Sequence, residues 1–501
     1  MAKKSILDHF PKKLIPRDVQ KNTLLALQEH WDKADIFVVN LPVASGKSAI
    51  SVTLASWIKK ASIITPSKLL VDQYKDEYGY LHVLRAKADY WCETFNCPLT
   101  KRPQQKKLGK TCKKDLGCLG CMQYLRDLRR ARVMPYLLSN YYIYLAHRLY
   151  RDSLIIDEAH CLTDVLKQMA SKKLWHFQYK WPSNIKTTNE LKEWINSLPP
   201  EAFNRRGKAS GETSFGIVQE NLIALKNELN SYRPTYLIDI TTDDYNGEEY
   251  DCIKMVPLDI SDHPPIMWPS QVKKIILLSA TISRKDIEQI GLSGRKIQYI
   301  QADSPINAER RPIIVPQESK SMAMRVQDNN LPDMISYISN VSRYHKEEKG
   351  VIHVTYGLAK KLQAAQFPKD VSDRLIFHSK QDKTKRYNEF RDSKEPKILV
   401  ASGMYEGIDL AYDAGRWQII AKVPWPNLGN PAIKYMCDKD DAWYTWEALK
   451  TIMQGCGRIC RTPTDYGATY VYDMTVKRLY ESGIKNNLIP DWFKNSIRWE
   501  I

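Results

Sequence analysis

Two short apolar segments of this chain each run directly into a polar loop that suits phosphate or metal chemistry. The segment 36–40 (IFVVN) runs into LPVASGKS, and 154–156 (LII) runs into DEAH. A short apolar run that stops at a polar loop is typical of a buried parallel strand. A Gly-Lys-Ser turn can cradle phosphates on its backbone amides, and an acidic pair at a second strand end can bind Mg²⁺ and orient water. The two loops therefore indicate an α/β fold with a nucleotide-hydrolysing site.

The same pattern of strand and polar loop recurs in both halves of the chain. It is found at 62–68 and 274–283, and again at 350–356, 374–379, 397–402, 418–426 and 468–473. Between such runs, apolar positions recur at helical spacing, for example from Lys47 to Lys59. Strands that alternate with helices predict doubly wound α/β domains. We expect two of them, the second beginning near Gln301.

The charge balance indicates a polyanionic partner. The formal net charge is +18, and an excess of Lys and Arg favours nucleic acid because phosphate neutralisation releases counterions. No segment approaches the roughly 20 uninterrupted apolar residues of a membrane span. The N-terminal residues lack an apolar signal-peptide core, so we expect a cytoplasmic protein that does not bind membranes.

A cysteine cluster separates the two loops. Its members are Cys92, Cys97, Cys112, Cys118 and Cys121. Thiols stay reduced inside cells, so such a cluster indicates metal ligands rather than disulfides. Thiolates suit iron–sulfur clusters and zinc alike, and the spacing of the last two cysteines fits either.

Two segments after the cysteine cluster carry further candidate residues. QGCGRICR carries Arg458 and Arg461, whose spacing on a helix would present both guanidinium groups along one face, as fingers for a phosphoryl transition state. The aromatic-rich segment 174–181 (LWHFQYKW) lies in a polar, largely helical stretch, and we expect it to serve packing rather than base stacking.

Together these motifs resemble the iron–sulfur branch of the superfamily 2 helicases, which contains DinG and XPD. The similar segments are IPRDVQ (15–20), TPSKLLVDQ (65–73), LLSATIS (277–283), SGMYEGIDL (402–410), VPWPNLGNP (423–431) and QGCGRICRTPTDYG (454–467). The resemblance implies an α/β fold with two RecA-like motor domains, the first interrupted by an Fe–S domain and a small helical Arch domain. The implied boundaries are 1–78, 135–165 and 251–300 for the first motor domain, 79–134 for the Fe–S domain, 166–250 for the Arch and 301–501 for the second motor domain.

The resemblance also implies roles for the matching residues. The catalytic residues would be Lys47, Asp157, Glu158, Gln454, Arg458 and Arg461. ATP would contact Gln20, Leu41, Pro42, Val43, Ala44, Ser45, Gly46, Lys47, Ser48, Glu406, Gly407 and Asp409. Ser48 and Asp157 would hold Mg²⁺. Leu41 and Ala44 depart from the family pattern, which has glycine at these positions.

Further positions are assigned to coupling, DNA and metal in the same way. Coupling of nucleotide state to the track would involve His160, Ser279 and Thr281, and DNA would contact Thr65, Ser67, Thr355, Tyr356 and Ser402. A 4Fe-4S cluster would be held by Cys92, Cys112, Cys118 and Cys121, with Cys97 as an alternative ligand and Zn²⁺ as an alternative metal.

The implied function is an ATP-dependent DNA helicase that moves 5′→3′ on single-stranded DNA and unwinds forked or structured DNA. We expect a monomer, acting in DNA replication or repair close to the nucleoid of a bacterial or phage-infected cell. Two alternatives stay open: an ATP-gated nucleic-acid clamp without processive unwinding, and an RNA helicase.

Overall fold

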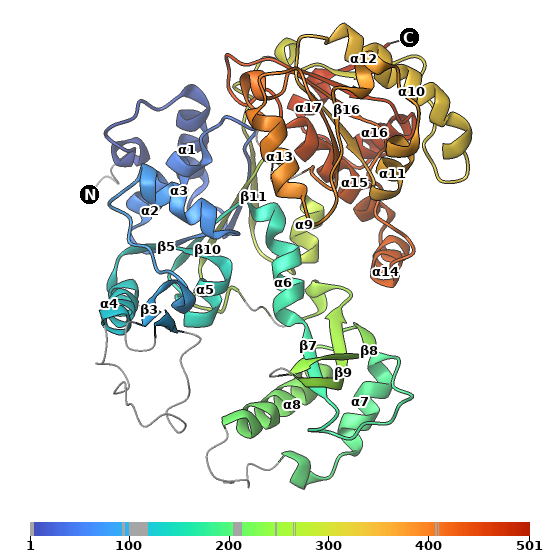
Figure 1. Cartoon of the computed structure of the whole chain (residues 1–501). Coiled ribbons are helices and arrows are strands. Elements are labelled where there is room, and N and C mark those ends of the chain that lie inside the picture. The colour runs from blue at the N-terminus through green and yellow to red at the C-terminus, as the bar shows by residue number, and fades with distance from the viewer. Residues whose placement is uncertain are drawn as a thin grey trace. The chain divides into compact units, whose positions relative to one another are not determined.

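The computed structural model describes residues 5–92, 96–99, 119–203, 213–245, 248–263, 265, 267–405, 408 and 410–500, with the side chains of 119–121 and 213–221 outside that description. The chain forms two compact units (Figure 1). The first comprises Met1–Val39, Lys47–Ser279 and Asp286–Ile300, and the second comprises Asn40–Gly46, Ala280–Lys285 and Gln301–Ile501.

A six-stranded sheet is the centre of the first unit. Its strand order is β11 (Ile297–Gln301), β1 (Ile36–Asn40), β10 (Lys274–Ser279), β6 (Ser153–Asp157), β2 (Ala61–Thr65) and β5 (Tyr136–Asn140). Strand β6 pairs in parallel with both β10 and β2, so that Ile155 lies opposite Ile276 on one side and Ile63 on the other. All five residues of β2 and of β6 are buried, which explains their apolar composition.

Helices connect these strands. They are η1 (Ile6–His9), α1 (Asp18–His30), α2 (Lys47–Ile58), α3 (Lys68–Glu77), α5 (Tyr141–His147), η4 (Ala159–Cys161), α6 (Leu162–Ala170) and α9 (Arg284–Gln289). Helix α2 begins at the lysine of the Gly-Lys-Ser turn, directly after β1. The strand–loop–helix order expected from the sequence is therefore present.

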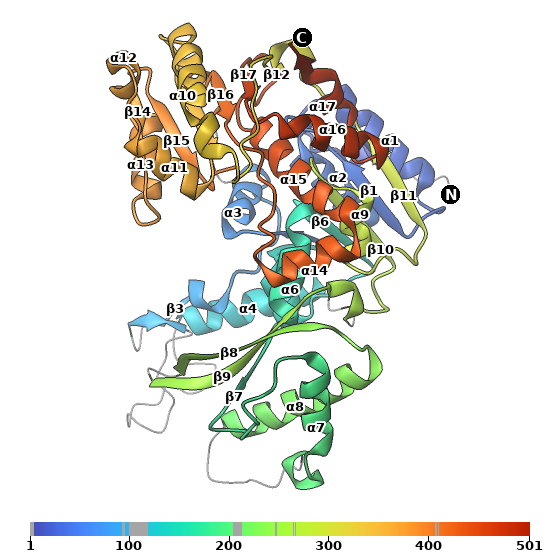
Figure 2. The ribbon, with the colours of Figure 1, turned by 90° about the vertical axis from the view of Figure 1, so that its right-hand side faces the viewer.

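Two smaller substructures interrupt the first unit. One contains η2 (Lys87–Asp89), the two-stranded ribbon β3 (Trp91–Cys92) and β4 (Cys97–Pro98), and helix α4 (Leu119–Val133). The other has an antiparallel sheet in the order β7 (Lys172–Trp175), β9 (Glu248–Pro257) and β8 (Tyr236–Tyr245), with α7 (Thr188–Ser197), η5 (Pro200–Phe203), α8 (Thr213–Ser231) and η6 (Ile260–Asp262). Both views show α7 and α8 on the same side of that sheet (Figures 1 and 2).

The second unit is built on a parallel sheet of seven strands. Its order is β14 (Leu375–Ile376), β15 (Ile398–Ser402), β13 (Gly350–Val354), β16 (Trp417–Ile420), β17 (Ala468–Val471), β12 (Ile313–Val315) and β18 (Ile497–Trp499). Its helices are η7 (Ala308–Arg310), α10 (Gln327–Tyr344), α11 (Tyr356–Ala364), α12 (Lys369–Ser372), α13 (Lys383–Asp392), η8 (Tyr412–Ala414), α14 (Pro431–Lys439), α15 (Asp441–Cys456), α16 (Thr475–Lys485) and α17 (Asp491–Ser496).

Both faces of this sheet carry a hydrophobic core. Ile352 and Val354 pack with α10 and α11 in one cluster, whereas Val351 between them belongs to another. This alternation buries β13 on both sides, as expected for a parallel strand covered by helices. The α/β class with two parallel sheets is thus confirmed. The boundaries proposed for the Fe–S and Arch domains stay predictions. Among the described helices, none is long and apolar enough to cross a membrane.

Candidate nucleotide site and nucleic-acid surface

The loop between β1 and α2 has the backbone shape of a phosphate-binding turn. Ala44 and Gly46 both have positive φ, 69° and 73°. Glycine adopts this conformation freely, but a side chain at Ala44 makes it strained, which explains why glycine is common there. Ser45 is buried and donates a hydrogen bond to the Pro42 carbonyl at 2.6 Å. Leu41 is fully buried, so its side chain has a packing role.

An ion pair joins the two sequence motifs. Lys47 Nζ lies 3.0 Å from Glu158 Oε1, and His160 Nδ1 lies 3.4 Å from Glu158 Oε2. The same His160 nitrogen is 3.0 Å from Ser279 Oγ, at the end of β10. Lys47, at the start of α2, therefore meets Glu158 and His160, which follow β6, at the carboxyl end of a parallel strand, with Ser279 beside them.

Asp157 is the buried member of this group. Its carboxylate accepts hydrogen bonds from Tyr74 Oη at 2.9 Å and from the Glu158 backbone amide at 3.0 Å. Burial, and then the negative charge of Glu158, raise the pKa of the Asp157 carboxyl, while Lys47 opposes this shift. A buried carboxylate whose charge is poorly compensated is a suitable ligand for a divalent cation.

Helix α3 supplies neighbours that the sequence motifs did not reveal. Ser48 Oγ donates to Glu77 Oε2 at 3.2 Å and lies 3.3 Å from Tyr78 Oη. Burial raises the pKa of the Tyr78 hydroxyl, so it stays protonated and can act as a donor. Ser48, Asp157 and Glu77 are the oxygen-bearing groups that fit Mg²⁺ here, because hard cations prefer oxygen ligands.

Other predicted residues of the first unit have local structural roles. Gln20 is buried, and its Oε1 accepts the Arg17 amide at the start of α1. Thr65 is fully buried at the end of β2. Ser67 caps α3 by accepting the Leu70 amide at 3.2 Å. Thr281, in the segment Ala280–Lys285 that belongs to the second unit, is also buried.

One hollow of the second unit gathers the predicted DNA contacts of that unit. Thr355, Tyr356 and Ser402 line a cavity of about 400 Å³ together with His378, Lys380 and Lys383. His378 Nε2 accepts the Ser402 amide at 3.0 Å, and the Tyr356 ring is 51% exposed. The two lysines and the histidine follow β14 in the sequence. The only sequence feature that could have predicted their place in this hollow is a polar loop after an apolar run.

The arginines of the QGCGRICR segment are held by main-chain carbonyls. Arg458 donates from Nε to the Tyr405 carbonyl at 2.7 Å and from Nη1 to that of Ile408 at 3.3 Å. Arg461 donates from Nη1 to the Gly457 carbonyl at 2.9 Å. Gln454 precedes them near the end of α15, where its Nε2 is buried and makes no hydrogen bond within the described part of the chain.

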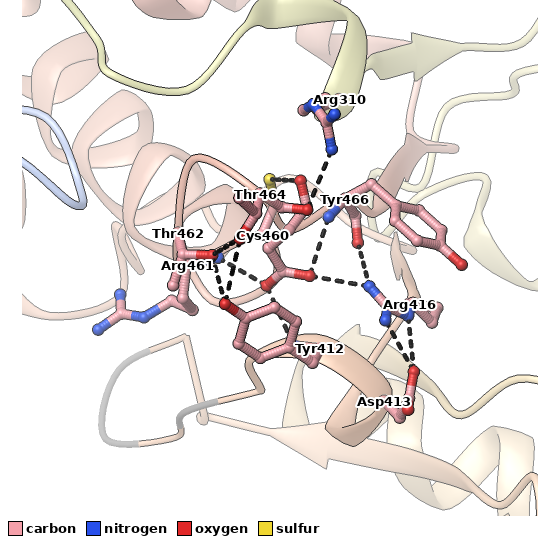
Figure 3. Close-up of polar contacts among 10 residues, drawn as sticks. Arg310, Tyr412, Asp413, Arg416, Cys460, Arg461, Thr462, Thr464 and Tyr466 are labelled. Atoms are coloured by element: carbon pink, nitrogen blue, oxygen red, sulfur yellow. Dashed lines mark hydrogen bonds and ion pairs between the residues drawn. The ribbon is translucent and has the colours of Figure 1, made fainter.

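Asp465 organises the backbone around Arg461 (Figure 3). Its Oδ2 accepts the amides of Tyr412 at 3.0 Å and Arg461 at 2.9 Å, and its Oδ1 accepts Arg416 Nη1 at 2.8 Å. Arg416 also pairs with Asp413 at 2.7 Å. The Arg461 guanidinium points away from this network in Figure 3. Asp465 thus ties the segment after β15 to the arginine segment, which the sequence pattern alone did not predict.

Five predicted residues lie outside the described residues. They are Glu406, Gly407, Asp409, Cys112 and Cys118, and the side chain of Cys121 is outside as well. Cys92 is buried and lies directly opposite Cys97 in the β3–β4 register. Opposite residues of an antiparallel pair project from the same face, so both thiols suit one metal group. In the described ranges, no set of three His, Cys, Asp or Glu side chains forms a metal site.

The second unit also matches a known domain family. Residues 345–496 match the family described as the helicase C-terminal domain. Among curated relatives, 3'-5' exonuclease DinG of Bacillus subtilis (strain 168) is 24% identical over 222 residues, which cover 40% of this chain and 24% of that protein. A regulator of telomere elongation helicase 1 homolog of Drosophila grimshawi is 28% identical over 126 residues, covering 22% of this chain and 12% of the relative. The matched stretches thus span about a quarter or less of these relatives.

Solved structures extend the similarity over the whole fold. An XPD helicase aligns with 97% of this chain and 100% of its own length, with a TM-score of 0.59 and 13% identity. The chain is DinG/XPD-like. S. tokodaii Xpd4 gives a TM-score of 0.56 at 14% identity, with coverage of 97% and 100%. Identity this low shows the fold alone. The resemblance to DinG/XPD-like superfamily 2 helicases is confirmed in sequence and architecture.

Proposed function

We propose that this DinG/XPD-like chain is an ATP-dependent DNA helicase that translocates 5′→3′ on single-stranded DNA. The observation that carries the ATPase is the meeting of Lys47, Glu158 and buried Asp157, with Lys47 Nζ 3.0 Å from Glu158 Oε1. Substrate and polarity rest on the resemblance to DinG and XPD. The cytoplasm is the compartment that we propose for this activity, and a monomer is the proposed form.

Nucleotide binding would exchange the partners of the first-unit charges. Lys47 would leave Glu158 for the β and γ phosphates, because two phosphate oxyanions attract an ammonium more strongly than one half-exposed carboxylate. Glu158, once released, would accept the proton of the attacking water. His160 would report this change to Ser279, which is 3.0 Å away. Mg²⁺, held by Ser48 and Asp157, would neutralise developing phosphate charge.

Residues of the second unit would stabilise the γ-phosphate in the transition state and bind the single-stranded DNA. Arg461 and Arg458 are proposed as the γ-phosphate fingers, with Gln454, Glu406, Gly407, Asp409 and Thr281 coupling nucleotide state to DNA. The exposed Tyr356 ring could stack on a base, and Lys380 and Lys383 in the same hollow could pair with phosphates. Thr65, Ser67, Thr355 and Ser402 are the remaining proposed DNA contacts.

The cysteine segment is proposed to hold a 4Fe-4S cluster. Such a cluster would staple β3, β4 and α4 together, and the facing thiols of Cys92 and Cys97 support two ligands from the ribbon. Anaerobically purified protein should contain iron and sulfide near four per chain and absorb in the visible range. Stoichiometric zinc without iron would reject the cluster.

A forked-substrate assay tests the function. We expect ATP-dependent strand separation on forks with a 5′ tail, and none on substrates with only a 3′ tail. Unwinding from the 3′ tail alone would reject the polarity. ATP-dependent binding without separation on any tailed DNA would favour the clamp, for which the strained Ala44 is the supporting observation. Preferential unwinding of RNA duplexes would favour an RNA helicase.

A further inference from the structure

The three-stranded sheet β7–β9–β8 has two chemically different faces. On the inner face, Leu174, Ile253 and Met255 are buried in a core with Leu191 of α7 and Leu225 of α8. Side chains alternate along a strand, so the residues between them project from the outer face, away from the helices. In the segment 174–181, Leu174 and Trp181 therefore serve packing as expected, whereas Trp175 does not belong to that core.

Four aromatic rings cluster on the outer face. Trp175 lies 5.2 Å from Tyr245, and Phe177 lies 5.1 Å from Tyr245 and 4.7 Å from Tyr250, measured between ring centroids. Phe177 is 48% exposed, and the other three rings are half-buried. An exposed cluster of rings at one edge of a small sheet is unusual for a surface without a partner, because water solvates it poorly.

Carboxylates surround these rings. Residues 239–251 contain six acidic side chains and no Lys or Arg, in a chain whose net charge is +18. Five of the six are exposed: Asp239, Asp244, Glu248, Glu249 and Asp251. Asp239, Asp243 and Glu248 share the outer face with the rings, whereas Asp244, Glu249 and Asp251 alternate onto the face of Ile253. The hairpin therefore carries a local charge opposite to that of the protein as a whole.

The lysines of this face are paired within it. Asp243 lies 2.5 Å from Lys173 Nζ and 2.9 Å from Lys254 Nζ, and these two partners hold the pKa of its carboxyl well below the usual range. The single carboxylate of Asp243 thus bridges two ammonium groups, and Lys173 Nζ also lies 4.8 Å from the centroid of the Trp175 ring. Phosphates of a nucleic acid would meet the exposed carboxylates of the hairpin, which repel them.

We propose that the outer face of this sheet, defined by Trp175, Phe177, Tyr245, Tyr250 and the carboxylates of Asp239, Asp243 and Glu248, binds an arginine-rich segment of a partner protein. Guanidinium groups stack on aromatic faces and pair with carboxylates in a planar fork, so one arginine side chain can satisfy both features of the surface. A lysine ammonium, a strongly hydrated point charge, fits the stacked geometry less well. This binding is independent of ATP hydrolysis and goes beyond the helicase function.

The test is fluorescence anisotropy with the full chain in the absence of nucleotide. The probes are a labelled peptide of alternating arginine and glycine, its lysine counterpart, and a single-stranded oligonucleotide of similar length. We expect the arginine peptide to bind more tightly than the lysine peptide. Replacing the rings (Phe177→Ala with Tyr245→Ala) or the charges (Asp239→Asn with Glu248→Gln) should weaken it about tenfold or more. Phe177→Ala alone, at an exposed position, serves if the double variant fails to fold.

The matched control is Glu193→Gln with Glu201→Gln. It removes the same charge from exposed carboxylates of α7 and η5, on the helical side of the same substructure. Its affinity for the arginine peptide should match that of the unaltered chain. An equal loss in this control, or no loss in the ring variant, would overturn the proposal. Weakened oligonucleotide binding in the ring variant with unchanged peptide binding would assign the face to nucleic acid instead.

Discussion

The charged groups of the nucleotide site in the first unit are paired with one another, whereas the two arginines of the QGCGRICR segment in the second unit donate to main-chain carbonyls. Lys47, Glu158 and His160 form a side-chain relay that ends on Ser279. Arg458 and Arg461 instead donate to carbonyls of Tyr405, Ile408 and Gly457. A side-chain ion pair can change partners when a phosphate arrives, but an arginine bonded to carbonyls fixes the loop that carries them. The ion pair of the first unit can therefore exchange partners on nucleotide binding, whereas the two arginines of the second unit hold their loop in a fixed position.

The largest expected effect follows from removing the Lys47 ammonium group, which can exchange Glu158 for phosphate. Lys47→Ala should lower DNA-stimulated ATP hydrolysis at least about a hundredfold, because the ammonium that stabilises transferred phosphate charge is gone. Phosphate release measured with and without single-stranded DNA checks this. Lys60→Ala, an exposed lysine that lies 3.9 Å from Asp152, is the control and should keep full activity. Retained hydrolysis in Lys47→Ala would refute the site.

Asp465→Asn tests whether the activity depends on the position of the Arg461 backbone, which Asp465 holds. An asparagine keeps only one side-chain oxygen, so it cannot accept the Tyr412 and Arg461 amides and also Arg416, which would lose a buried counter-ion. We expect unfolding free energy to fall by about 3 kcal/mol and kcat to fall roughly tenfold, while KM for ATP changes little. Urea unfolding and steady-state kinetics measure both.

The matched control for that variant is Asp413→Asn. Its side chain is 94% exposed and contacts the same Arg416 without touching the Arg461 backbone. Kinetics and stability close to those of the unaltered chain are expected. If the two variants behaved alike, the backbone of Arg461 would not depend on Asp465.

The pH dependence of the first unit should follow Asp157. Burial raises the pKa of this carboxyl from 3.8 to about 6, so the folded state without Mg²⁺ binds this proton more tightly than the unfolded state does. This contribution to stability is complete below the unfolded pKa and is lost as pH rises through about 6. Melting temperatures measured from pH 4 to 8 in EDTA should show this loss of stability as the pH rises. The Asp157→Asn variant should not show this pH dependence. Binding of Mg²⁺ with nucleotide should instead weaken as the pH falls, because protonation of Asp157 competes with the metal.

The smallest effect concerns backbone strain in the phosphate loop. Ala44→Gly should raise the unfolding free energy by about 1 kcal/mol, because glycine adopts a φ of 69° without penalty. Ala49→Gly, inside α2, is the contrasting control and should destabilise by a similar amount. Thermal unfolding distinguishes them. A destabilised Ala44→Gly would show that the loop is not strained.

Local sequence was sufficient for the elements that carry the nucleotide site. Lys47 and Asp157 each follow an apolar run, and parallel strands place such loops on one edge of a sheet, so their meeting could be expected. The same logic brought Thr355 and Ser402 into one hollow. The partners from α3, Tyr74 and Glu77, could not be expected, because their approach depends on how that helix packs.

The amino-acid sequence by itself determined the α/β class, the two parallel sheets and the order of the motifs, since each follows from short-range apolar periodicity and turn chemistry. Only the tertiary structure decided which groups share a carboxylate, such as the four donors to Asp465, and which rings meet across β7, β8 and β9. These contacts join residues far apart in the chain, and their geometry is set by strand register and helix packing, which periodicity does not specify.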